Sequence, residues 1–107
     1  MAFNENDKKY LYEGYSQAAG RRGDVYVLKK GNCWHLNAGV NSRGHDTGFG
    51  VFYDVSCDSE EFNAFEQFLE KTDRIQQFIK SELGAEDDVC NEIFRKIWDY
   101  IHHTSCN

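Results

Sequence analysis

The chain of 107 residues has the length of one domain and carries a net charge of −6. Apolar residues make up 40% and aromatic residues 15% of the sequence, which argues against a disordered chain and supplies one hydrophobic core. The negative charge argues against direct binding of nucleic-acid phosphates, and no apolar stretch reaches the length of about 18 residues that a membrane-spanning helix needs. We therefore expect a single domain over residues 1–107.

The N-terminal segment at 4–19 fits two kinds of element. Its apolar residues, among them Tyr10, Leu11 and Tyr15, lie near helical spacing, so we expect a helix. A strand through residues 10–12 is the alternative, because tyrosine favours sheets.

Three strands are expected next. Residues 24–29 are β-branched and aromatic, and the residues at 30–32 are typical of a tight turn. Residues 33–38 and 49–55 alternate between apolar and polar side chains, as half-buried strands do. Neighbouring strands usually pair, so these segments predict an antiparallel meander.

The second half of the chain predicts helices. Asp58 and Glu61 have the spacing of a capping box, with which a helix begins. Apolar residues then recur every three or four positions over 62–83, with a bend expected at Thr72, and a last helix follows the acidic residues at 86–88. The predicted fold is α+β, with a small three-stranded antiparallel β-meander, an N-terminal helix (or strand) and two to three C-terminal helices packed on one face of the sheet.

The loop from Gly39 to Gly50 has the highest density of reactive side chains. Arg43 is suited to binding an anion, and His45 with Asp46 has the chemistry of an acid–base pair. The same composition is typical of a long connection between strands, which is the interpretation that we prefer.

The four cysteines match no disulfide framework or zinc-ribbon spacing. The first residues also lack the apolar segment of a secretory signal, so we expect free thiols and a cytoplasmic protein. A reactive Cys57 before the first C-terminal helix is an alternative to an inert one. Two incomplete groups of metal ligands remain open, with no metal or other cofactor expected; they are Cys33 with His35, and His102 with His103 and Cys106.

Acidic side chains gather in the helical half. Residues 59–107 contain eleven acidic and five basic side chains, and the aromatic residues exceed the needs of one small core. A solvated helix face explains this pattern on its own, and a surface that fits a basic partner is the sharper alternative. We predict that the partner-binding residues are Glu60, Glu66, Glu70, Asp73, Glu82, Asp87, Asp88, Tyr26, Phe52 and Arg43.

These features predict a small protein-binding inhibitor that is not an enzyme and that blocks a basic nucleic-acid-binding or catalytic surface. In length and charge the chain resembles phage-encoded inhibitors of bacterial defence, of the anti-CRISPR type, and bacterial toxin-immunity proteins. The resemblance implies a protein partner such as a nucleic-acid-binding effector or a toxin, met in the host cytoplasm. The alternatives are a small enzyme or ligand-binding domain that uses the loop from Gly39 to Gly50, and a structural homodimer.

Overall fold

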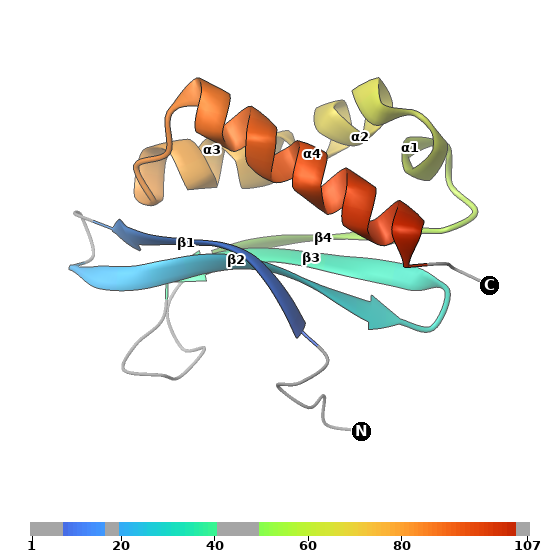
Figure 1. The fold of residues 1–107 in the computed structure, drawn as a ribbon, viewed down its shortest axis with the longest axis horizontal. Helices are drawn as coiled ribbons and strands as arrows, with labels where there is room; N and C mark the ends of the chain where they lie inside the picture. Colours follow the sequence, from blue (N-terminus) through green and yellow to red (C-terminus); the bar gives the residue numbers. More distant parts are fainter. Residues whose placement is uncertain (1–7, 17–19, 41–49, 105–107) are drawn as a thin grey trace.

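A computed structural model describes residues 8–16, 20–40 and 50–104, which form two layers (Figure 1). One layer is an antiparallel sheet of four strands in the order β1-β2-β3-β4. The α+β class and the meander agree with the sequence-based prediction, but the prediction of three strands is wrong. The strands are β1 (Lys8–Ser16), β2 (Arg21–Lys30), β3 (Cys33–Val40) and β4 (Gly50–Ser56).

The additional strand is β1, where the sequence analysis preferred a helix. It pairs with β2 from Lys8 opposite Leu28 to Ser16 opposite Arg21, so the alternative of a strand is confirmed. The register shifts between Tyr10 and Tyr12, and Leu11 and Tyr12 both pack against the core. This irregularity breaks the strict alternation of a strand, which explains why the apolar residues imitate helical spacing.

The hairpin of β2 and β3 agrees with the sequence pattern. Its turn contains Gly31 with φ +61°, a backbone conformation that glycine adopts readily. Along β3 every second residue is buried, beginning with Trp34. Trp34 lies in the core with its ring centroid 5.8 Å from that of Tyr100.

The second layer consists of helices that cover one face of the sheet (Figure 1). Their N-caps are Ser59, Ala64, Thr72 and Glu86, so the predicted capping box at Asp58 is wrong. The bend expected at Thr72 is confirmed, and an extended Ala64 adds a second interruption. The helices are α1 (Glu60–Asn63), α2 (Phe65–Lys71), α3 (Asp73–Glu82) and α4 (Asp87–His103).

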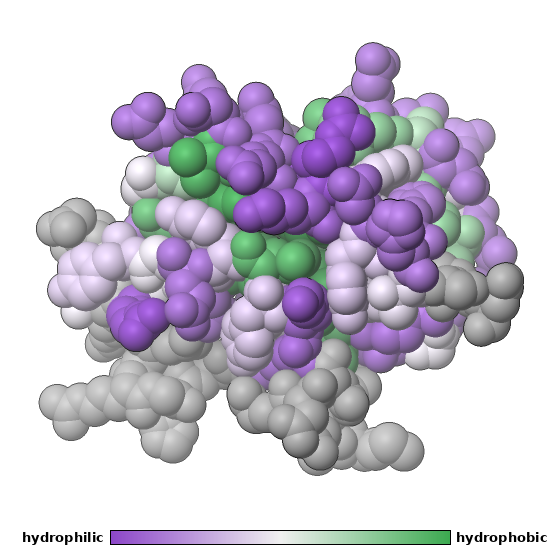
Figure 2. Space-filling view, viewed as in Figure 1, coloured by the Kyte–Doolittle hydropathy of each residue, from purple (hydrophilic) through white to green (hydrophobic). Residues whose placement is uncertain are grey.

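The hydrophobic core lies between the two layers. Phe68 of α2 is completely buried and packs on Phe94 and Trp98 of α4, at centroid distances of 6.0 and 5.4 Å. The helices use their apolar sides for this contact, so their other sides are hydrophilic, as Figure 2 shows over much of the helical layer. Among the described helices, none is both long and apolar enough to cross a membrane.

Candidate protein-binding surface

The outer side of the helical layer is acidic. The described residues of this layer, 59–104, contain eleven acidic and five basic side chains, a net charge of −6. The described residues of the sheet and its connections, 8–16, 20–40 and 50–58, contain four acidic and six basic side chains, a net charge of +2. The charge is therefore divided between the two layers.

Most of the predicted acidic residues are accessible. Only Glu82 is half-buried. The exposed ones are Glu60, Glu66, Glu70, Asp73, Asp87 and Asp88. Within the described helices, two of the carboxylates form ion pairs. Asp87 pairs with Lys80 at 3.4 Å, and Glu92 pairs with Lys96 at 3.6 Å. Exposed ion pairs of this kind are weak, so the layer keeps its excess of negative charge.

One carboxylate of this layer has a structural role instead. The Tyr53 hydroxyl donates a hydrogen bond to Glu61 Oε1 at 2.7 Å, which joins β4 to α1. Burial, together with the hydrogen bond and the charge of Glu61, raises the pKa of Tyr53 to about 12. The same hydrogen bond is the main cause that lowers the pKa of Glu61, so this carboxylate is charged and held in place.

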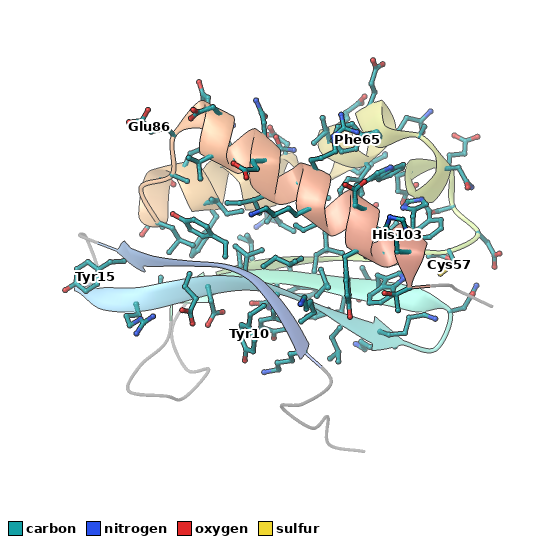
Figure 3. The ribbon with its side chains drawn as sticks, viewed as in Figure 1. Tyr10, Tyr15, Cys57, Phe65, Glu86 and His103 are labelled. Carbon is teal, nitrogen blue, oxygen red and sulfur yellow. The ribbon has the colours of Figure 1, made fainter. Side chains whose placement is uncertain are left out.

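A groove of about 440 Å³ lies between α2 and α4. Phe65 and Leu69 of α2 give it an apolar floor, and Asn91, Glu92 and Arg95 of α4 complete its lining. The guanidinium carbon of Arg95 lies 4.3 Å from the Phe65 ring centroid. Figure 3 shows Phe65 on α2, on the outer side of the helical layer. This groove could not be predicted from the sequence, because the helical periodicity of Phe65 and Leu69 indicates core positions as well as half-exposed ones.

The end of α4 is fixed to α1 by His102. Its ring is stacked on Phe62 at a centroid distance of 4.3 Å and lies 4.1 Å from the Trp98 ring. Its Nδ1 lies 2.8 Å from the Trp98 carbonyl oxygen and its Nε2 lies 2.7 Å from the Phe62 carbonyl oxygen. Carbonyl oxygens only accept hydrogen bonds, so each ring nitrogen can bond to its carbonyl oxygen only as a donor. His102 therefore has a structural role, although both it and its neighbour His103 are exposed.

The opposite face of the sheet carries aromatic side chains. Tyr26 lies on this face, 5.6 Å from Tyr10 between ring centroids, and Phe52 lies 5.2 Å from His35. Phe52 is 64% exposed, but Tyr26 is only 8% exposed, so of the two predicted contact residues Phe52 is the accessible one.

Beside Phe52, Asp54 Oδ1 and His35 Nδ1 are 2.6 Å apart. The described residues contain no group of three or more His, Cys, Asp or Glu side chains that could hold a metal ion. The predicted residues Arg43, His45, Asp46 and Cys106 lie outside the described ranges.

The expectation that all cysteines are free thiols is wrong for Cys57. Cys57 is disulfide-bonded, whereas Cys33 and Cys90 are free. A disulfide-bonded sulfur is not a nucleophilic thiolate, so the structure contradicts the alternative of a reactive Cys57.

Comparison with known proteins adds no assignment: no family model matches the chain, and no curated protein or solved structure is significantly similar to it.

Proposed function

We propose that the protein is an inhibitor that binds another protein and covers a basic nucleic-acid-binding or catalytic surface with its helical layer. The division of charge between the two layers is the observation that supports this proposal. A surface that normally attracts phosphates also attracts carboxylates, and complementary charge accelerates association and disfavours wrong partners.

The exposed carboxylates of the helical layer are the contact residues in this proposal. Glu66 and Glu70 follow each other by one turn on α2, and Asp87 and Asp88 lie in the first turn of α4. An effector of bacterial defence or a toxin has the properties of the proposed partner, and the protein itself catalyses no reaction. The cytoplasmic location stays a prediction, against which the disulfide at Cys57 argues, because disulfides are rare in the cytosol.

Affinity capture with charge variants tests the proposal. Tagged wild-type protein and the variant E66Q/E70Q/D88N are compared for a stoichiometric partner in a cell extract, and the purified partner is then assayed for nucleic-acid binding or catalysis. Loss of three contact charges weakens the complex roughly tenfold and reduces its salt dependence. The control K71Q/R74Q/K96Q removes three exposed basic groups from the same layer and binds at least as tightly as the wild type.

Two results contradict the proposal. One is a partner that binds E66Q/E70Q/D88N as tightly as the wild type, and the other is a partner whose activity is unchanged in the complex.

A second candidate function, a homodimer through the face of the sheet opposite the helices, is favoured by the exposed ring of Phe52. Light scattering combined with size-exclusion chromatography tests it, since Phe52→Ser then converts a dimer to a monomer.

A further inference from the structure

We infer that the groove between α2 and α4 accepts apolar side chains of a basic amphipathic helix presented by the partner protein. This inference rests on the proposed function and names the kind of partner segment that the acidic layer binds.

The floor of the groove is suited to an apolar side chain. Phe65 and Leu69 are one helical turn apart on α2, and both are only half-buried. Behind them the Phe65 ring meets Trp98 edge-on at 5.3 Å, so the floor is supported by the aromatic core. The volume of about 440 Å³ is within the range of natural ligand pockets, about 300–1,000 Å³. Anchor side chains buried in such pockets carry much of the binding free energy at protein interfaces.

The surroundings of the groove favour positive charge in the occupant. Glu92 lines the groove, Asp88 lies one turn before it on α4, and Glu66 and Glu70 adjoin the floor residues on α2. All four carboxylates are exposed. A segment that combines an apolar side with lysine or arginine on its flanks therefore matches both the floor and the rim. Binding of an amphipathic helix between two helices is a common mode of recognition.

Arg95 is the side chain that such a helix displaces. Its guanidinium carbon is 4.3 Å from the Phe65 ring centroid, and no carboxylate among the described residues forms an ion pair with it. Its charge also repels a basic occupant, so its removal improves binding. Arg74 on α3 is exposed and does not line the groove, and it provides a control with the same side chain.

The experiment measures binding of two synthetic peptides by fluorescence anisotropy at low salt. Both consist of lysine and leucine in the same proportions and have about 18 residues, enough to form a helix on binding. The leucines of the first peptide recur every three or four positions, and those of the second peptide are scattered.

We expect the amphipathic peptide to bind the wild type about tenfold more tightly than the scattered peptide, the effect of burying one leucine. Leu69→Ser removes this difference and leaves the weak, salt-dependent binding of both peptides. Arg95→Ala tightens binding of the amphipathic peptide more than Arg74→Ala does. Both arginines are exposed, so this second comparison does not depend on the stability of the Leu69 variant.

The negative outcomes separate the two proposals. Equal binding of the two peptides, or equal effects of Arg95→Ala and Arg74→Ala, overturns the role of the groove and leaves the acidic surface intact. No binding of either peptide contradicts both proposals. A wild-type dimer that Leu69→Ser dissociates assigns the groove to a second copy of the chain, which also overturns the inference.

Discussion

At the scale of single residues, Tyr53 connects the layers through a hydrogen bond with a defined pH dependence. Its folded-state pKa of about 12 lies above its ordinary value of 10, mainly because of burial. The folded protein therefore holds this proton more tightly than the unfolded chain does. The resulting stabilisation is complete below pH 10 and is lost as the pH rises from 10 to about 12.

Tyr53→Phe removes this titration together with the hydrogen bond to Glu61. We expect the variant to be less stable at neutral pH by about 1 kcal/mol, the usual contribution of one hydrogen bond. We also expect its free energy of unfolding to decline less steeply above pH 10 than that of the wild type. Urea unfolding followed by circular dichroism between pH 7 and pH 11 measures both effects. The exposed Tyr15→Phe serves as control, and identical slopes for the wild type and Tyr53→Phe contradict the assignment.

At the scale of elements, the strands approach closely at glycine positions. A Cβ atom on Gly23 of β2 would lie 2.7 Å from the carbonyl oxygen of Gly39 in β3, and it would also meet the Leu83 side chain. A neighbouring backbone cannot give way as a side chain can, so only glycine fits this position.

Gly23→Ala is expected to destabilise the protein by about 2 kcal/mol. The cost of overpacking in the folded state exceeds the stabilisation that alanine gives by lowering the conformational entropy of the unfolded chain. Gly14→Ala on β1 is the matched control. There the nearest atom, at 3.0 Å, belongs to the Tyr12 side chain, which can move. Thermal unfolding of the two variants measures the loss of stability in each. A larger loss of stability for Gly14→Ala than for Gly23→Ala contradicts this explanation.

The elements also show how far the sequence determines the fold. The hairpin of β2 and β3 is predictable because both alternation and turn chemistry are local. The N-terminal strand β1 is not predictable from the sequence. Its bulge disrupts the alternation, and only pairing with β2 decides between strand and helix. The acidic surface follows from helix periodicity and charge. The groove cannot be predicted from the sequence, because it depends on how α2 and α4 pack. The sequence does not distinguish a half-buried Phe65 from a buried Phe68.

At the scale of the whole molecule, the disulfide at Cys57 has a measurable consequence. In denaturant without reductant, alkylation modifies Cys33 and Cys90, and Cys57 reacts only after reduction. Peptide mass spectrometry distinguishes these sites. Reduction lowers the free energy of unfolding by about 2–4 kcal/mol, as for other disulfides. Cys33→Ser keeps the same response to reductant, and labelling of Cys57 in unreduced protein contradicts the prediction.

The unequal charge of the two layers also gives the molecule a permanent dipole moment across the sheet. The electric field of a cationic partner surface orients this dipole as the two proteins approach each other. In most encounters the helical layer therefore faces the partner first. The strands then face away, and a fluorophore attached on the face of the sheet opposite the helices would report on the complex without lying between the two proteins.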